Sequence, residues 1–180
     1  MKYGTMAHLE FRKKVLMIQK TKRDNDPNSG CFTLPGGKLK DLEKIHKKGR
    51  LESVIRETQE ETGLILIKPR LQGVILFDNS ERIFDDWENP ENFQVYLFVA
   101  ENYGGQLIGN SNEGFPQWVN KESILDLPKN EGDKKIYEWL KKGLYFAGVI
   151  KHKGKKLDEE GTFVDYFMSF SNYCKDFSEA

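Results

Sequence analysis

The sequence has few cysteines and lacks any long apolar run. Its 180 residues include only two cysteines, Cys31 and Cys174, which form neither a disulfide framework nor a zinc-type spacing. This favours a reducing compartment, and the cytoplasm is the predicted location. No apolar stretch approaches the ~20 residues of a membrane-spanning helix. The N-terminal stretch MKYGTMAHLEFRKK has no apolar core followed by a small-residue cleavage site, so a signal peptide is not expected.

The chain also lacks net charge. Lysine and arginine total 28, and aspartate and glutamate total 28, so no global field attracts DNA or a membrane surface. The basic segment 38–50 has no interleaved aromatic residues and is predicted to be a solvated loop. A stable nucleic-acid or membrane partner is therefore not expected. A small anionic substrate stays open, because a bound cation or a local basic cluster could attract it.

The composition and the residue patterns predict one mixed α/β domain over residues 1–180. The composition, 38% hydrophobic and 31% charged, is typical of a folded domain. Runs rich in β-branched and aromatic residues predict strands at 13–20, 64–77, 92–103 and 114–119, and a two-stranded hairpin at about 145–170. Turn-forming residues predict loops at 21–30, 38–50 and 78–92 and a turn at 104–107.

Two main helices are predicted. Apolar residues at helical spacing indicate a helix over 51–63 that ends at Gly63. A second helix is expected over 132–143, with Asp133 as a candidate N-cap and Gly143 as its end.

The first of these helices carries an unusual concentration of glutamates in the stretch RETQEETGL. At 3.6 residues per turn, Glu57, Glu60 and Glu61 lie on one side of the helix and repel one another. Carboxylates gathered in this way suit a hard divalent cation. The preceding PGG stretch would let the carbonyl of Gly36 approach the same cation, because glycine has no obstructing side chain. Taken alone, these residues leave a solvated acidic face open as the alternative.

The wider pattern GGKLKDLE…RETQEETGL resembles the Nudix box, here at about residues 36–64. The positions that match its fixed residues are Gly37, Glu43, Arg56, Glu57, Glu60, Glu61, Gly63 and Leu64. The resemblance implies the Nudix fold, an α/β (α+β) arrangement of mixed β-sheets sandwiched between helices. It also implies a hydrolase that cuts the pyrophosphate of a nucleoside diphosphate derivative. The glycines of PGGK do not have the spacing of a P-loop.

The resemblance also implies roles for individual residues. The carbonyl of Gly36 and the carboxylates of Glu57, Glu60 and Glu61 would bind Mg²⁺, with Mn²⁺ as the alternative cation. Arg56 would pair with neighbouring carboxylates and fix their rotamers. Outside the box, Glu113 is the candidate for a further metal ligand or a general base. The candidates for contact with substrate phosphates are Lys20, Gly37 and Lys38.

Two departures from the box stand out. Twelve residues separate Glu43 from Arg56, where the family has seven, so the loop before the helix is expected to be longer. Counting backwards from Arg56 would instead put Lys48 at the glutamate position. The other departure is Thr58 at a usually apolar position, where its methyl group is still expected to pack.

A further resemblance covers roughly residues 8–168. The stretch EGFPQWVNKESILDLP, the FAG motif after the second helix and the closing hairpin are similar to the 8-oxo-dGTP diphosphatases. That branch of MutT-type enzymes sanitises the nucleotide pool by releasing monophosphate and pyrophosphate. Asp133 occupies the place of its purine-reading acid.

Other positions of the expected base pocket differ from the animal enzymes of that branch. Phe32 and Thr33 stand in place of a Trp-Asn pair, Asn130 in place of a stacking tryptophan, and Gly132 in place of an aspartate. Base preference therefore stays open.

Three alternatives remain at this point. The substrate could instead be ADP-ribose, a dinucleoside polyphosphate or another nucleoside diphosphate derivative. A non-catalytic Nudix module that binds nucleotides is disfavoured by the complete set of box glutamates. A monomer and a homodimer are equally compatible with the sequence.

Overall fold

The computed structural model describes residues 1–180 apart from 23–27, 46–47, 84–90 and 171–180. Its strands are β1 (Lys2–Phe11), β2 (Lys14–Lys20), β3 (Phe32–Thr33), β4 (Gly36–Lys38), β5 (Leu64–Ile67), β6 (Arg70–Arg82), β7 (Phe93–Ala100), β8 (Asn102–Gly105), β9 (Gly114–Asn120), β10 (Tyr145–Gly154) and β11 (Thr162–Phe170). Its helices are α1 (Asp41–Ile45), α2 (Gly49–Thr62), the 3₁₀ helix η1 (Lys121–Asp126) and α3 (Glu131–Leu140). No helix in this part of the chain is long and apolar enough to span a bilayer.

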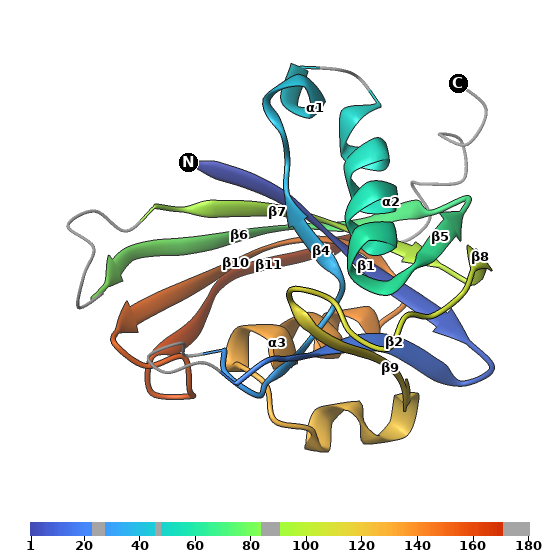
Figure 1. The fold of residues 1–180 in the computed structure, drawn as a ribbon. Helices are drawn as coiled ribbons and strands as arrows, with labels where there is room; N and C mark the ends of the chain where they lie inside the picture. The colour runs from blue at the N-terminus through green and yellow to red at the C-terminus, as the bar shows by residue number, and fades with distance from the viewer. Residues whose placement is uncertain (23–27, 46–47, 84–90, 171–180) are drawn as a thin grey trace.

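A mixed sheet of nine strands organises the described residues (Figure 1). The strands follow the order β11-β10-β6-β7-β1-β2-β3, with β4 paired to β1 and β9 paired to β2. Strand β1 is parallel to β7, and β10 is parallel to β6, whereas the other pairings are antiparallel. Strands β5 and β8 form a separate two-stranded sheet beside α2.

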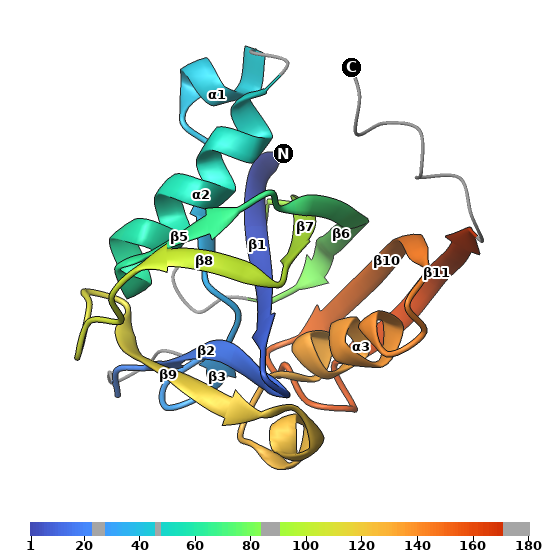
Figure 2. The same cartoon turned by 90° about the vertical axis from the view of Figure 1, so that its right-hand side faces the viewer.

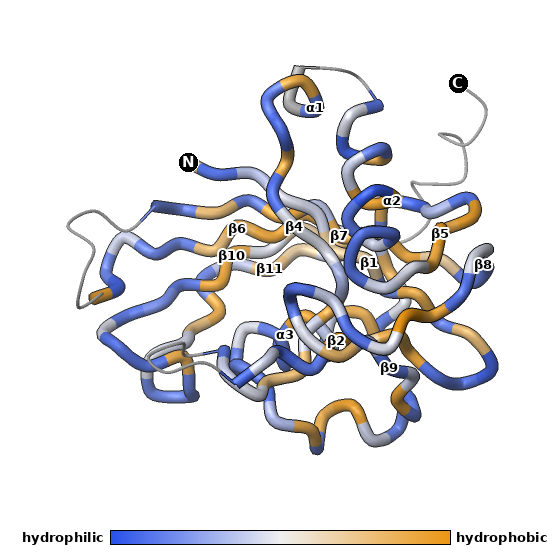
Figure 3. Tube along the Cα trace, in the orientation of Figure 1, coloured by the Kyte–Doolittle hydropathy of each residue, from blue (hydrophilic) through white to orange (hydrophobic). Residues whose placement is uncertain are grey.

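Two hydrophobic cores lie on opposite faces of the large sheet, and each is covered by one main helix. Figure 2 shows α2 and α3 on either side of the central strands. Val54 of α2 packs with Leu9 and Phe98 in one core. Ile136 and Trp139 of α3 pack with strand residues of β2, β6, β7 and β10 in the other. Apolar residues accordingly concentrate along the central strands, and polar ones at their ends (Figure 3). The expected sandwich of sheet between helices is confirmed.

Several predicted elements match the structure closely. The strands predicted at 13–20 and 114–119 are β2 and β9, and the hairpin predicted at 145–170 is formed by β10 and β11. The helix predicted over 51–63 is α2, which ends where Gly63 adopts a left-handed conformation with φ of 76°. Thr58 is fully buried in that helix, and its hydroxyl donates to the carbonyl of Val54 at 2.7 Å. Thr58 stands where the Nudix box usually has an apolar residue, and this bond satisfies the hydroxyl group that threonine adds.

Other predictions were wrong. Strand β1 was missed because its buried residues include the polar Thr5 and His8, which hide the strand pattern. The single strand predicted over 64–77 divides into β5 and β6 at Lys68 and Pro69, since Lys68 has a left-handed φ of 50°. The prediction over 92–103 divides into β7 and β8, and β8 includes two of the four residues predicted to form a turn at 104–107.

Two of the predicted loops contain regular structure. Segment 38–50 begins in β4 and includes α1 and the first residues of α2. In segment 78–92, β6 continues as far as Arg82, and residues 84–90 lie outside the described part of the chain.

The predicted N-cap of the second helix was also wrong. Helix α3 begins at Glu131, with Asn130 in the N-cap position, so Asp133 lies inside the first turn. The chain enters the helix early because buried Glu131 pairs with Lys134 at 3.0 Å and Lys135 at 2.9 Å, which stabilises this turn. The helix ends at Leu140, three residues before Gly143.

We expect Gly148→Ala to lower the free energy of unfolding by ~1–3 kcal/mol, the usual cost of overpacking a core. A Cβ at Gly148 would lie 2.6 Å from the ring of Trp139. That ring is itself stacked on Phe167 with a centroid distance of 4.8 Å, so it has little room to move. Urea denaturation followed by circular dichroism measures the change. Gly104→Ala is the control, because its Cβ would meet nothing within 4 Å; equal stability of the two variants would contradict this packing.

Candidate active site

Arg56 lies at the centre of a group of glutamates on α2 and α1. Its Nε and Nη2 donate to the two carboxylate oxygens of Glu43 at 2.8 and 3.1 Å. Its Nη1 lies 2.7 Å from Glu57 Oε1 and 3.1 Å from Glu60 Oε2. Donating hydrogen bonds to Glu43 raises the pKa of Arg56, and accepting them lowers the pKa of Glu43. These are the ion pairs that the resemblance implied for Arg56.

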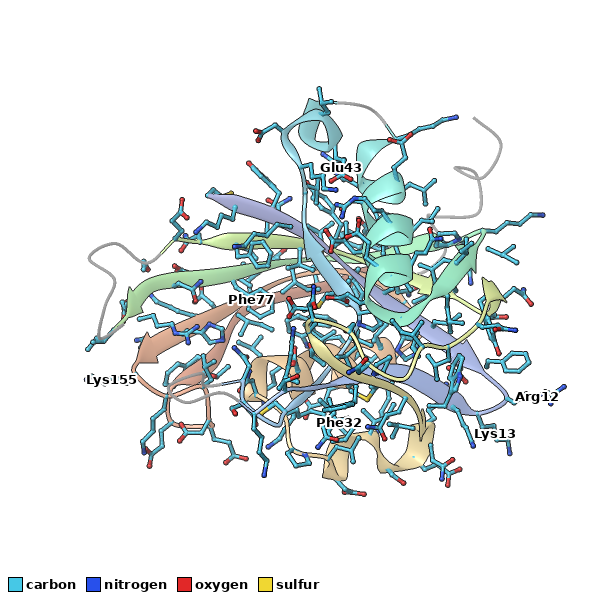
Figure 4. All side chains as sticks on the ribbon, viewed as in Figure 1. Arg12, Lys13, Phe32, Glu43, Phe77 and Lys155 are labelled. Atoms are coloured by element: carbon cyan, nitrogen blue, oxygen red, sulfur yellow. The ribbon has the colours of Figure 1, made fainter. Side chains whose placement is uncertain are left out.

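The longer spacer before α2 leaves Glu43 in contact with Arg56. Glu43 lies on the short helix α1 (Figure 4), and the amide of Lys40 donates to its Oε2 at 2.6 Å. Helix α1 packs closely on the start of α2, because a Cβ at Gly49 would lie 1.9 Å from the carbonyl oxygen of Glu43. Lys48, the alternative found by counting backwards, is exposed at the N-cap of α2. Glu43 therefore takes the position that the box assigns to its first glutamate.

Gly36 and Gly37 of strand β4 lie directly against the glutamates of α2. A Cβ at Gly37 would lie 2.3 Å from Glu57 Oε2, so this carboxylate occupies space that only glycine leaves. The amide of Gly36 donates to Glu61 Oε2 at 2.8 Å. Gly36 itself has a φ of 154°, and a Cβ there would lie 2.1 Å from the carbonyl of Thr5 in β1. Strand β4 and helix α2 are thus held together through the candidate site.

Glu61 is the buried member of the cluster, with 6% of its surface exposed. The pKa of Glu61 is raised to about 7, chiefly by burial and to a lesser extent by the nearby carboxylates of Glu113 and Glu57. The Gly36 amide and the Lys20 ammonium oppose this rise. Lys20 also pairs with Glu113 Oε2 at 2.6 Å. Glu113, predicted from outside the box, therefore lies in the same electrostatic neighbourhood as the box glutamates.

The donor chemistry of this cluster fits a hard divalent cation. The carboxylates of Glu57 and Glu113 act repulsively on that of Glu61, so a positive charge near them would lower the energy. In the described residues, no three acidic, histidine or cysteine side chains already converge as a metal cluster. Glu57 and Glu60 are turned toward Arg56, and Glu61 is turned toward the Gly36 amide.

A second polar group lies at the start of α3. The hydroxyl of Thr33 hydrogen-bonds to Asp133, and burial raises the pKa of Asp133 to about 6, against the opposing effects of Lys129, Thr33 and Lys20. Lys20 acts electrostatically on both Glu61 and Asp133. The predicted base-reading acid and the glutamate cluster are consequently neighbours.

The remaining predicted substrate residues have different surroundings. Phe32 is buried in the core that α3 covers. The side chain of Asn130 hydrogen-bonds to Asn28. Lys38 is exposed on β4. Of the predicted substrate set, Lys20, Thr33, Gly37 and Asp133 have contacts or electrostatic interactions in the candidate site.

Phe77 and His152, which no sequence motif indicated, stack with a centroid distance of 5.6 Å. A Cβ at Gly132 would lie 3.2 Å from the Phe77 ring and 3.4 Å from His152 Nε2, so the pair forms a wall beside the start of α3. His152 Nδ1 lies 2.8 Å from Asn79 Oδ1, and burial lowers the pKa of His152 to about 4. In the sequence, the alternating pattern of β6 and β10 indicates only that Phe77 and His152 face inward from their strands, and it does not indicate that the two side chains meet.

Comparison with known proteins decides the family. A model of the NUDIX domain matches residues 5–140. The chain belongs to the NUDIX domain family. The expected assignment to the Nudix hydrolases, which act on phosphoric anhydride bonds, is thereby confirmed.

Among relatives of this Nudix chain, an uncharacterized Nudix hydrolase, YvcI of Bacillus subtilis, is 36% identical over 141 residues, which cover 77% of this chain and 78% of that protein. An ADP-ribose pyrophosphatase of Methanocaldococcus jannaschii is 44% identical over 100 residues, 55% of this chain. The match spans 50% of the length of that relative.

Solved Nudix structures share the fold. A MutT protein from Bacillus halodurans superposes with a TM-score of 0.71 and 26% identity, covering 94% of this chain and 97% of that one. The NUDIX domain of Shewanella oneidensis NrtR, solved with ADP ribose, gives a TM-score of 0.60 at 17% identity over 78% of this chain and 86% of that one. The second likeness supports the fold alone.

Glu43→Gln should reduce nucleotide hydrolysis by about 10- to 100-fold, the usual effect of losing a partner that orients a ligating residue. The neutral amide cannot accept both Arg56 hydrogen bonds, so Arg56 is freed to move away from Glu57 and Glu60. Steady-state kinetics with Lys48→Gln as control measure the effect. A larger loss in Lys48→Gln than in Glu43→Gln would overturn the assignment of Glu43.

Gly37→Ala should lower the hydrolytic activity while leaving the stability of the fold nearly unchanged. The added methyl displaces the Glu57 carboxylate, the mobile end of a side chain, so the free energy of unfolding should change by less than ~1 kcal/mol. Hydrolysis should fall by about tenfold or more, because a ligating group is misplaced. Gly109→Ala, whose Cβ would meet nothing within 4 Å, is the control. Wild-type activity in Gly37→Ala would show that Glu57 need not occupy this position.

Proposed function

We propose that this Nudix chain is an Mg²⁺-dependent pyrophosphohydrolase of nucleoside triphosphates, which releases monophosphate and pyrophosphate. Purine deoxynucleotides, including oxidised ones such as 8-oxo-dGTP, are the proposed substrates. The observation that carries the proposal is the arrangement around Lys20, which pairs with Glu113 at 2.6 Å and acts electrostatically on both the buried Glu61 and the half-buried Asp133. Phosphate chemistry and base recognition would thus take place at adjoining parts of one site.

The metal would be held by the carboxylates and by one backbone group. The proposed ligands are the carbonyl of Gly36 and the side chains of Glu57, Glu60, Glu61 and Glu113, with Mn²⁺ as the alternative cation. When bound, Mg²⁺ supplies Lewis acidity toward phosphate oxygens and lowers the pKa of a coordinated water.

The side chains around the metal position have separate tasks. Arg56 fixes the orientation of Glu57 and Glu60, and the Gly36 amide fixes that of Glu61. Lys20 is paired with Glu113 at 2.6 Å, and a substrate phosphate would compete for the same ammonium group. Arrival of the substrate would then release the Glu113 carboxylate to act as a ligand or as the general base.

Recognition of the base is assigned to the start of α3. With its pKa raised to about 6, Asp133 is mostly ionised at neutral pH and accepts hydrogen bonds from purine N–H groups. Thr33 holds the carboxylate in place through its hydroxyl. The stacked rings of Phe77 and His152 form an aromatic wall next to the neighbouring residue Gly132. The similarity of the FAG motif and closing hairpin to the 8-oxo-dGTP diphosphatases, together with the MutT structure, supports this choice of substrate.

ADP-ribose is the second candidate substrate. The relative from Methanocaldococcus jannaschii, 44% identical over 100 residues, is named an ADP-ribose pyrophosphatase. The two candidates differ in their products, because ADP-ribose would give two monophosphates and no pyrophosphate.

We further propose a domain organisation, a location and an oligomeric state for the protein. A single catalytic domain over residues 1–180 would act in the cytoplasm as a monomer or homodimer and sanitise the nucleotide pool.

A product screen with Mg²⁺ over oxidised and normal nucleoside triphosphates, ADP-ribose and dinucleoside polyphosphates tests the proposal. We expect a purine triphosphate to be the best substrate, with monophosphate and pyrophosphate released in equal amounts.

Glu61→Gln should retain its fold and lose on the order of 100-fold or more in turnover, since several kcal/mol of charge stabilisation depend on the metal. Glu52→Gln, a change at an exposed position of the same helix, should remain active. Near-normal turnover in Glu61→Gln would remove it from the metal site, and preferred cleavage of ADP-ribose would favour the second candidate.

A further inference from the structure

Strands β10 and β11 have two faces with different surroundings. Along β10, Phe146 and Ile150 are fully buried in the core that α3 covers. Successive side chains of a strand point to opposite faces, so Ala147 and Val149 lie on the other face of the sheet. Figure 2 shows α3 against the first of these faces. We call the second one the outer face.

Large apolar side chains of β11 are exposed on the outer face. The pairing register places Phe163, Tyr166 and Met168 opposite outer-face residues of β10, and directly opposite residues share a face. These three side chains are 44%, 47% and 40% exposed. Leu76 of β6 lies beside Val149 and extends the apolar surface to a third strand. Exposed apolar residues are usually scattered singly, whereas a contiguous group of them marks an interaction site.

The charges at the border of the outer face are paired within the chain. Lys151 and Lys153 both contact Glu81, the second of them at 3.2 Å. The ammonium group of Lys153 also lies 5.3 Å from the centroid of the Phe163 ring. Nucleic acids and anionic lipids are bound by cations that can contact phosphates, and these two lysines already have a carboxylate partner. The outer face therefore suits an apolar partner without a strong charge.

The edge of β11 is less suited to association than its face. In the described part of the chain, β11 ends the large sheet and has β10 as its neighbour. The register shifts between Val149 and Ile150, whose partners are Tyr166 and Val164, so Asp165 is an extra residue in a β-bulge. Bulges and exposed charges protect an edge strand from pairing with another chain. Contact through the face is thus favoured over extension of the sheet.

We propose that the outer face is a homodimer interface, which packs against the same face of a second copy across a two-fold axis. An apolar surface is complementary to itself, as such an isologous contact requires. The chain carries 28 basic and 28 acidic residues, so no net charge repels a second copy. Sheets packed face to face lie about 10 Å apart with interdigitated side chains, which buries Tyr166 and Met168. The interface shares no residue with the candidate active site, and the proposal does not depend on the hydrolytic reaction.

Sedimentation equilibrium of the wild-type chain, from about 1 to about 100 µM, tests the association. We expect a reversible monomer–dimer equilibrium with a Kd in the micromolar range or below. Isotope-filtered NMR on a mixture of ¹³C-methyl-labelled and unlabelled chains then locates the interface. Intermolecular contacts are expected at the methyl group of Met168 and not at those of Ile67. Both measurements use the unaltered protein and do not depend on a variant that folds.

Variants with a charge on the outer face provide the second test. Tyr166→Asp and Met168→Glu should each weaken the dimer by at least about 100-fold, because the two-fold axis buries every introduced charge twice. Ile67→Asp is the matched control, since Ile67 is 46% exposed on β5 and should leave the dimer intact. Circular dichroism checks that the variants keep their fold. Glu61→Gln should form the dimer as the wild type does, so failure here and failure of the hydrolase proposal can be distinguished.

Three results would overturn the proposal. A wild type that stays monomeric at the highest concentration would show that the outer face is open or is covered by the chain's own residues. A dimer that is unchanged in folded Tyr166→Asp and Met168→Glu would use another surface. Intermolecular NMR contacts at Ile67 and not at Met168 would lead to the same conclusion.

Discussion

The ion pairs of Arg56 with Glu43, Glu57 and Glu60 are the interaction on which the candidate site depends. Without a cation among them, carboxylates on neighbouring turns of α2 would repel one another and spread into solvent. The guanidinium group offsets this repulsion and, being planar with several fixed donors, also determines where each carboxylate points. Glu61 is oriented independently, by the amide of Gly36. The site is therefore assembled from three elements, α1, α2 and β4, that meet around one arginine.

Close packing of backbone against functional side chains explains why glycines accompany these acids. Gly37 leaves the space that Glu57 occupies, and Gly49 lets α1 approach α2 closely enough for Glu43 to reach Arg56. Although twelve residues separate Glu43 from Arg56, the contact between the two side chains is retained. Lys20 acts electrostatically on both this cluster and Asp133, and the proposed combination of phosphate chemistry with base recognition rests on that arrangement.

The sequence predicted the parts of the structure that depend on local pattern. The helix ending at Gly63, the strand at 13–20 and the closing hairpin follow from spacing and turn residues. It could not predict β1, a central strand, because the buried polar residues Thr5 and His8 interrupt its apolar pattern. Within the site, the box motif identified the glutamates, whereas the wall formed by Phe77 and His152 depends on how β6 and β10 pair.

The central claim, that Arg56 positions the carboxylates for a divalent cation, is tested most directly by Mn²⁺ binding to the wild type and to Arg56→Lys, measured by electron paramagnetic resonance. Lysine keeps the charge and loses the fork of donors. The account predicts that the wild type binds Mn²⁺ and that Arg56→Lys, with its fold retained, binds about 10- to 100-fold more weakly. Equal affinity in the two proteins would contradict it.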